Sequence, residues 1–245
     1  MKNWIWIFAA LLILASCKKA EDRKCFKSAG KPGTKTIALP AFDRLLLHEH
    51  VEYLLIQDST DRVVITGGEN LLNFISCEVA DGLLEIKNVN KCSFLRNLSK
   101  KVKVEIHFTS LINLHYEGSE PLHTQDTINA PYFTMMIRDG AGPVNMTLNS
   151  ILIYADISHG WGDYTLSGKT NFARISARSN GFCNTFGLAI RDSVEVYSDT
   201  PGTIKINADG IPLRGLMKAS GDIWYLGSPS LIAVVEKSTG KLVQK

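Results

Sequence analysis

Aspartates recur in or near the predicted turns of the second half of the chain, where their carboxylates would gather along one edge of a repetitive fold. Enzymes that cleave polysaccharides build acid–base pairs or calcium sites from such rows. Aspartate is also a natural turn former, because its side chain hydrogen-bonds to its own backbone. No basic partner recurs at matching positions, so we interpret the row as turn residues and predict no catalytic residue and no metal site. The row comprises Asp139, Asp163, Asp199, Asp209 and Asp222.

Aromatic residues provide a second candidate chemistry. Trp161 stands in the tight turn Gly160-Trp161-Gly162, where burial is harder than in a strand. Flat sugar faces stack on exposed rings, so Trp161 and Trp224 are the candidate ligand-binding residues, with a purely structural role for Trp161 as the alternative. Tyr164 and Tyr225 are expected in the core.

His48 and His50 have the side chains of metal ligands. In a strand they would share one face while Glu49 points away, and no third ligand is in reach. We therefore expect this segment to form a solvated strand face.

Basic residues concentrate between positions 87 and 103. They have the charge to hold an acidic glycan or lipid phosphate, or to blunt a sheet edge and keep it soluble. The whole chain has 27 Lys and Arg against 24 Asp and Glu, a net charge of +3 that is too small to indicate nucleic acid. We predict no nucleic-acid partner and no cofactor. The basic residues are Lys87, Lys91, Arg96, Lys100, Lys101 and Lys103.

The elements that position these residues follow a repeat of about 20 residues. Turn glycines mark its units, and apolar residues recur between them, which predicts coils whose like residues stack into ladders. The predicted fold is an all-β parallel β-helix, right-handed by default. An antiparallel β-sandwich is the alternative. The glycines are Gly118, Gly140, Gly160, Gly181 and Gly221, and the predicted ladders are Leu122, Val144, Tyr164, Thr185, Ile204 and Tyr225, and Phe133, Ile153, Ile175, Val196 and Leu216.

The domain boundaries follow from this pattern. Residues 35–116 form an N-terminal β module, in which Asp81-Gly82 predicts a hairpin turn. Residues 117–235 form the β-helical repeat region, expected to be continuous with the module. Residues 236–245 are expected to be a polar C-terminal tail.

The N-terminus carries the features of an export signal. Residues 1–16 join a positive start to an apolar run that is too short for a stable membrane span. Leu14-Ala15-Ser16-Cys17 resembles a bacterial lipobox, which implies lipidation of Cys17 and a membrane anchor, here assigned to the outer membrane with periplasmic or surface display left open. Residues 17–34 are expected to be a lipidated tether.

Four further cysteines permit disulfides in an exported protein. Cys77 and Cys92 flank the predicted hairpin and are the candidate pair, whereas buried free thiols are the alternative. The remaining two are Cys25 and Cys183.

The chain resembles the family described as "Putative auto-transporter adhesin, head GIN domain". The resemblance rests on the lipoprotein leader, Phe42-Asp-Arg-Leu-Leu-Leu, Asp81-Gly-Leu-Leu-Glu-Ile-Lys leading into Asn90-Lys-Cys-Ser-Phe-Leu-Arg, and the Gly- and Ser-Asp-rich coils, over residues 36–230. It implies a β-helical cell-envelope protein and carries no catalytic residues to transfer. Thr185 and Gly187 depart from the pattern, which predicts an irregular stack near Cys183.

These observations favour a non-enzymatic, lipid-anchored adhesin or glycan-binding β-helix, whose partners are the membrane and glycans or envelope proteins. Two alternatives stay open. One is a β-helical polysaccharide lyase or hydrolase, which needs two carboxylates, or a carboxylate with Arg or Lys, converging in a groove. The other is a structural scaffold of the envelope.

Overall fold

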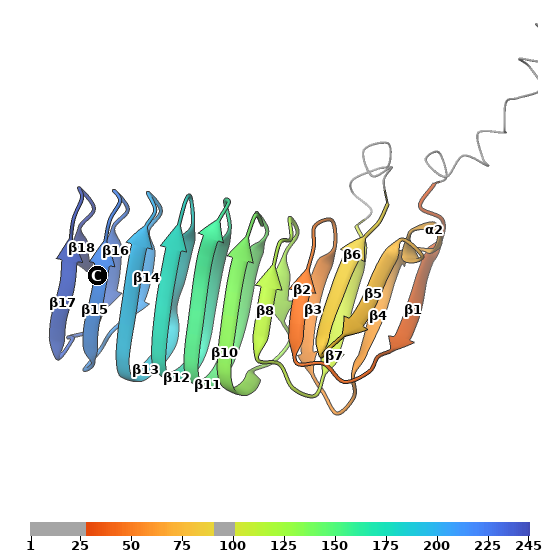
Figure 1. Ribbon diagram of the computed structural model, residues 1–245, viewed down its shortest axis with the longest axis horizontal. Helices are drawn as coiled ribbons and strands as arrows, with labels where there is room; N and C mark the ends of the chain where they lie inside the picture. Colours follow the sequence, from red (N-terminus) through yellow and green to blue (C-terminus); the bar gives the residue numbers. More distant parts are fainter. Residues whose placement is uncertain (1–27, 91–100) are drawn as a thin grey trace, which may run out of the picture.

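The computed structural model describes residues 28–90 and 101–245 and shows an all-β solenoid (Figure 1). All of its strands belong to one 18-stranded sheet that winds into flattened coils. The predicted β-helix is therefore confirmed, and the sandwich alternative is wrong. The signal peptide, Cys17, Cys25 and Cys92 lie outside the described residues. Within the described ranges, no helix is long and apolar enough to cross a membrane.

Each central coil is a long strand that bends once. The first half of the strand lies in one face of the solenoid, called face A, and the second half lies in the opposite face B, because the two halves pair with different partners. Neighbouring coils pair in parallel throughout. The strands from this point to the C-terminus are β10 (Ile128–Arg138), β11 (Pro143–His159), β12 (Asp163–Arg178), β13 (Phe182–Asp199), β14 (Ile204–Asn207), β15 (Pro212–Met217), β16 (Ile223–Leu226), β17 (Leu231–Glu236) and β18 (Leu242–Gln244).

The N-terminal coils are shorter and end in antiparallel pairing. On face A, β3, β7 and β9 continue the parallel stack, and β7, β4 and β1 then alternate in direction. On face B, β8, β2 and β6 are parallel and β5 closes the face as an antiparallel neighbour of β6. The elements are β1 (Pro32–Ala38), β2 (Arg44–Leu47), β3 (Glu52–Gln57), β4 (Arg62–Gly68), α2 (Glu69–Leu72), β5 (Ile75–Ala80), β6 (Leu83–Asn88), β7 (Lys103–Phe108), β8 (Asn113–Tyr116) and β9 (Leu122–Thr124).

The predicted hairpin joins β5 and β6. Asp81 and Gly82 both have positive φ, 51° and 77°, as a type I′ turn requires. Strands β5 and β6 pair antiparallel across this turn, with Cys77 opposite Ile86, so the hairpin prediction is confirmed.

The turn glycines form a column along one edge of the solenoid, here called the turn edge. A Cβ on Gly202 would lie 2.1 Å from the carbonyl oxygen of Gly181, and one on Gly221 would lie 2.2 Å from that of Gly202. Gly240 stands in the same relation to Gly221. Only glycine lets successive turns approach this closely, which is why the glycines repeat.

The predicted ladders are present, but several coils pair in a different register from the predicted one. Tyr164 pairs with Cys183 rather than Thr185, and Ile204 pairs with Ile223 rather than Tyr225. The turns differ in length. Counting a fixed number of residues from each turn glycine therefore misses the paired residue by two positions at these coils. A slip of two leaves a side chain on the same face of its strand, and Thr185 is accordingly buried.

The second ladder shows the same slip and one larger error. Ile153 pairs with Ala173 rather than Ile175. Val196 pairs with Gly215, so Leu216 is one residue out of register and faces outward, half-buried. A slip of one residue moves the side chain to the other face.

The irregularity predicted near Cys183 is present. Register shifts in the β12–β13 pairing fall between Thr165 and Ser167 and between Thr170 and Phe172, each inserting one extra residue into β13. The hydroxyl of Thr185 donates a hydrogen bond to the carbonyl of Lys205, 2.8 Å away, so this buried polar side chain is satisfied.

Two expected boundaries differ from the structure. Strand β1 begins at Pro32, inside the segment assigned to the tether, because residues 32–38 pair with β4. The expected polar tail contains β18, which pairs with β16 and extends face A by one strand. The N-terminal module and the repeat region form one continuous sheet, since β8 pairs with β10 and β9 pairs with β11.

Candidate functional site

Trp161 lies on the turn edge with 72% of its surface exposed. Gly160 precedes it with φ +103°, and the Trp161 amide donates to the Gly140 carbonyl at 3.4 Å. The backbone is thus held in the stack while the indole projects from it. This position provides an open aromatic surface, as a stacking role requires.

Phe182 is a second exposed aromatic residue on the same edge, one coil further on. Its side chain is 53% exposed, and its amide donates to the Gly162 carbonyl at 3.3 Å. The sequence reasoning missed Phe182. Its position directly after the turn glycine Gly181, in the coil next to Trp161, was the available signal.

Trp224 does not share this site. It lies on the outer surface of face A in β16, three coils from the turn of Trp161 and half-buried. Lys245 Nζ stands 4.0 Å from the centroid of its indole and Lys205 Nζ 5.5 Å from it. These cation–π contacts occupy ring surface that a sugar would need. The structure therefore does not bring the two candidate tryptophans together.

A long groove runs along the edge opposite the turns, here called the bend groove. Its volume is about 740 Å³, within the roughly 300–1,000 Å³ typical of ligand sites. Residues 129–131, 149–151, 169–171 and 189–191 line it, which places equivalent positions of four successive coils in a row. Adjacent parallel strands lie about 4.8 Å apart, so the groove repeats with that spacing.

Side-chain hydroxyls hold the bend. Ser150 Oγ lies 2.9 Å from the Leu152 carbonyl, and Thr170 Oγ1 lies 3.0 Å from the Phe172 carbonyl, each two residues ahead. Such local bonds satisfy backbone groups where the ladder changes direction. Ser150 and Thr170 are buried and form the floor of the groove.

The rim of the groove carries free polar groups. Asn149 donates to Asn129 across the coil step at 2.8 Å. Lys169 and Asn171 make no side-chain hydrogen bond or ion pair with any other residue that the structure describes. Ile151, 59% exposed, adds an apolar surface on the neighbouring coil. The groove thus combines amide, ammonium and apolar contacts in a repeating array.

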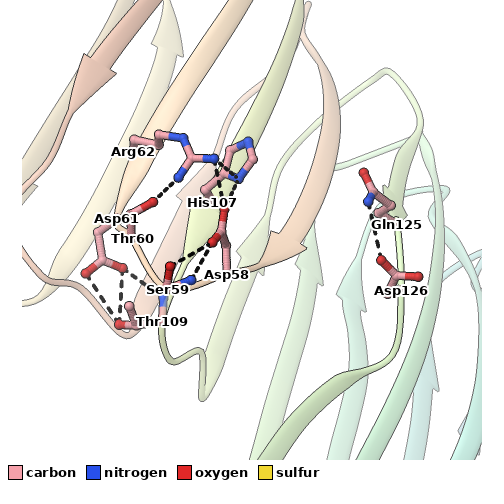
Figure 2. A network of polar contacts seen from close by, with 9 residues as sticks. All are labelled: Asp58, Ser59, Thr60, Asp61, Arg62, His107, Thr109, Gln125 and Asp126. Carbon is pink, nitrogen blue, oxygen red and sulfur yellow. Dashed lines mark hydrogen bonds and ion pairs between the residues drawn. The ribbon is translucent and has the colours of Figure 1, made fainter.

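A compact polar network ties the β3–β4 turn to β7 (Figure 2). Asp58 Oδ2 accepts from Arg62 at 2.8 Å and lies 2.9 Å from His107 Nδ1. Asp61 Oδ1 accepts the backbone amide of Thr109 at 2.9 Å. The sequence reasoning did not place these residues together, because they meet only through the pairing of β7 with β3 and β4.

This network has the composition of a catalytic site but not its electrostatics. The pKa of Asp58 is well below its usual range, chiefly because the Ser59 amide donates to it and further because His107 and Arg62 do. A carboxylate so strongly stabilised in its ionised form is a poor general base or acid near neutral pH. None of these residues lines the bend groove.

The turn aspartates divide between two edges. Asp139, Asp163, Asp199 and Asp222 lie at the turn edge, whereas Asp209 lies at the bend. Asp222 accepts the amide of Lys241 and Asp209 the amide of Ser228, each at 2.9 Å. These two carboxylates bind the backbone of the next coil, as turn residues do. In residues 28–90 and 101–245, no group of three or more His, Cys, Asp or Glu side chains is placed to hold a metal ion.

His48 is not on a strand face, contrary to the prediction. Strand β2 ends at Leu47, and His50 has φ 65° in the following turn. The ring of His48 lies between two carboxylates, with Nε2 2.9 Å from Glu85 and Nδ1 3.2 Å from Glu117.

The described lysines of the basic segment are paired with glutamates. Lys87 contacts Glu85 at 2.8 Å, and Lys103 contacts Glu105 at 3.1 Å. Lys101 likewise contacts Glu120 at 2.6 Å. This pairing favours the solubilising role over an anion site. Lys91, Arg96 and Lys100 lie outside the described residues.

Neither Cys77 nor Cys183 is bridged to another cysteine that the structure describes. Cys183 is buried against Tyr164, and burial raises the pKa of its thiol to about 12. Cys77 is half-buried, and burial raises its pKa to about 11. Because Cys92 lies outside the described residues, the Cys77–Cys92 bridge stays a prediction.

Several solved structures share this architecture and carry descriptions that refer to adhesion or binding. A putative adhesin from Bacteroides fragilis NCTC 9343 superposes with TM-score 0.80 at 20% identity, covering 88% of this chain and 97% of its own. A putative adhesin from Parabacteroides distasonis ATCC 8503 gives 0.60 at 20% identity, covering 88% and 98%. A putative lipid binding protein from the same organism gives 0.64 at 19% identity, covering 88% and 97%. At these identities the likeness shows the fold alone.

No curated protein sequence matches the chain. One family model does, and it aligns with residues 41–229, close to the range 36–230 over which the motifs resemble the family. That range holds most of the 245 residues. The chain belongs to the family described as "Putative auto-transporter adhesin, head GIN domain".

Proposed function

We propose that the protein is a non-enzymatic, lipid-anchored adhesin of the cell envelope that binds a glycan chain along the bend groove. The observation that carries the proposal is the repetition of the groove over four coils. A polymer of like units matches a surface whose contacts recur at a constant step. Lys169 and Asn171 are the proposed hydrogen-bond donors, and Ile151 is the proposed apolar contact for a sugar face.

The groove's lining argues against polysaccharide cleavage. Glycoside hydrolases need a pair of carboxyl groups beside the scissile bond. None of the residues that line the bend groove is Asp, Glu or His. Bound sugar would therefore meet donors and apolar surface but no carboxyl or imidazole group of the lining to act as general acid or base.

Trp161 and Phe182 are proposed as a second contact on the opposite edge. Both rings are exposed on adjacent coils, and their backbones are fixed in the stack. Two separate contacts on a rigid body raise retention on a polymer by multivalency. This arrangement suits adhesion to a surface rather than capture of a small molecule.

The leader and the relatives support the proposed location. Relatives described as putative adhesins support a place at the envelope or cell surface. The lipobox-like Cys17 supports attachment through acyl chains to the outer membrane. Metabolic labelling with palmitate tests the anchor: label on the wild type and none on Cys17→Ala is expected, and equal label on both would refute the anchor.

Binding to a panel of neutral hexasaccharides tests the groove. We expect Lys169→Ala and Asn171→Ala each to weaken the affinity for a bound member about three- to tenfold, the loss typical of one hydrogen bond. Lys237→Ala is the matched control, since its exposed side chain makes no hydrogen bond or ion pair with other described residues and lies at the turn edge. A wild-type protein that bound no glycan but was needed for envelope integrity would favour the scaffold role instead.

A further inference from the structure

A second groove lies on the outer surface of face B and differs from the bend groove in charge. Its volume is about 410 Å³, and it crosses β12, β13 and β15. Three arginines line it, namely Arg174, Arg178 and Arg214, together with one acidic residue, Glu195. The lining therefore has two more positive than negative side chains.

Glu195 already forms an ion pair with one of these arginines. Its Oε2 accepts from Arg174 Nε at 2.9 Å and from Arg174 Nη2 at 2.7 Å. Arg174 also stands 5.1 Å from the centroid of the Tyr154 ring. The Arg174 side chain is thus held in place on both sides, and it neutralises the only carboxylate of the groove's lining.

Arg214 is left with a free guanidinium. It pairs in register with Glu195, yet it makes no side-chain hydrogen bond or ion pair with any other residue in the described ranges. Its side chain is exposed at the groove. A guanidinium presents a planar fork of donors that matches a carboxylate or sulfate.

Two further cations surround Tyr197 at the same groove. The Arg178 guanidinium lies 5.8 Å from the ring centroid, and Lys218 Nζ lies 5.1 Å from it. The nearest carboxylate oxygen to Arg178, on Asp156, is 4.0 Å away, at the limit of an ion pair. Asp199 acts electrostatically on Lys218, so these two cations are partly balanced by nearby carboxylates, whereas Arg214 forms no ion pair with a described residue.

We infer that this groove binds the carboxylate or sulfate of an acidic sugar, with Arg214 as the principal contact and Arg178 beside it. The site is separate from the bend groove and does not depend on the glycan binding proposed there. Val196 is buried in the core, so the apolar side chains of the groove are Leu216 and the ring of Tyr197, and two cations stand near that ring. An acidic sugar rather than a lipid is therefore the favoured ligand.

Calorimetric titration with oligogalacturonate tests the site, and the methyl-esterified oligomer serves as the uncharged ligand control. We expect Arg214→Ala to weaken oligogalacturonate binding about tenfold or more, as loss of a charged hydrogen bond does. Arg214→Lys is expected to recover part of the affinity, because it keeps the charge without the fork. Arg138→Ala is the matched control, an exposed arginine on the same face outside the groove.

Three results would overturn the inference. They are equal affinity of Arg214→Ala and wild type for oligogalacturonate, equal affinity of wild type for the acidic and the esterified oligomer, and Arg214-dependent binding to phosphatidylglycerol vesicles without binding to oligogalacturonate. Ala189→Trp, which fills the bend groove, is expected to leave oligogalacturonate binding unchanged. Failure of the bend-groove proposal is thus distinguishable from failure of this one.

Discussion

Gly221 lies directly against Gly202 in the turn column, so that a Cβ on Gly221 would stand 2.2 Å from the Gly202 carbonyl oxygen and 2.4 Å from that of Thr200. Both obstacles are backbone atoms of the preceding coil, which cannot rotate away. The spacing between coils is set by their hydrogen bonds, and it leaves no room for a methyl group. The turn column is therefore a steric requirement of the stack.

Replacing Gly221 by alanine is expected to destabilise the solenoid by about 1–3 kcal/mol, the usual cost of overpacking. Chemical denaturation measures the free energy of unfolding. Gly67→Ala is the control, since its added Cβ would first meet a Val102 side-chain atom at 3.3 Å. If both variants were equally stable, the turn column would not limit the coil spacing.

Asp58 is expected to stabilise the fold in a pH-dependent way. Its pKa is lowered in the folded state, so its contribution is present above the unfolded pKa of about 3.9 and is lost as the pH falls below that value. Asp58→Asn should lower Tm at pH 7, and the gap to wild type should narrow below about pH 4. Asp126→Asn is the control, because Asp126 contacts only its neighbour Gln125 in Figure 2. A gap that stayed constant from pH 7 to pH 3 would contradict this role.

Cys183 is expected to resist alkylation in the folded protein. Burial and a pKa of about 12 leave almost no thiolate at pH 8. Iodoacetamide should modify Cys183 only after unfolding in guanidinium, as peptide mass spectrometry would show. Rapid labelling of the native protein would mean that the coil around Cys183 opens.

The predicted Cys77–Cys92 bridge has its own signature. Peptide mapping without reductant should give a peptide pair linked through these two cysteines, which separates after reduction. Recovery of Cys77 as an alkylated free thiol from unfolded, unreduced protein would show that the pair is not bridged.

Trp161 and Trp224 are expected to behave differently. Trp161→Ala should reduce retention on immobilised polysaccharide severalfold, because an open stacking surface is removed, while affinity for a short oligosaccharide in the bend groove stays unchanged. Trp224→Ala should leave both unchanged, since Lys245 covers its ring. Equal retention of Trp161→Ala and wild type would show that the turn edge does not contribute to polysaccharide binding.

Much of the fold could be predicted from the sequence because steric requirements repeat in every coil and select the same residue types. Gly140, Gly160 and Gly181 recur wherever coils must approach, and the apolar positions between them recur wherever side chains face inward. Register could not be predicted as well, because turn length and the two bulges of β13 leave no regular mark in the sequence. Cys183 occupies a ladder position, but its small side chain does not indicate this in the sequence.

The candidate sites were harder to predict because they combine residues from successive coils. Trp161 was identifiable from its two flanking glycines, which keep it in a turn. The bend groove was not, since Asn149, Lys169 and Ala189 look like ordinary strand residues until the register stacks them. Arg214 was missed for the same reason, because only the fold shows that Glu195 is already paired with Arg174.

Glycan binding in the bend groove is tested by calorimetric titration of the purified protein with cellohexaose, mannohexaose and chitohexaose, comparing wild type, Ala189→Trp and Ala233→Trp. Ala189 lies exposed in the bend groove, and Ala233 lies exposed on β17 away from it. We expect at least one hexasaccharide to bind wild type and Ala233→Trp alike, and to bind Ala189→Trp at least about tenfold more weakly. Binding of no hexasaccharide, or equal binding by all three proteins, would contradict glycan binding in this groove.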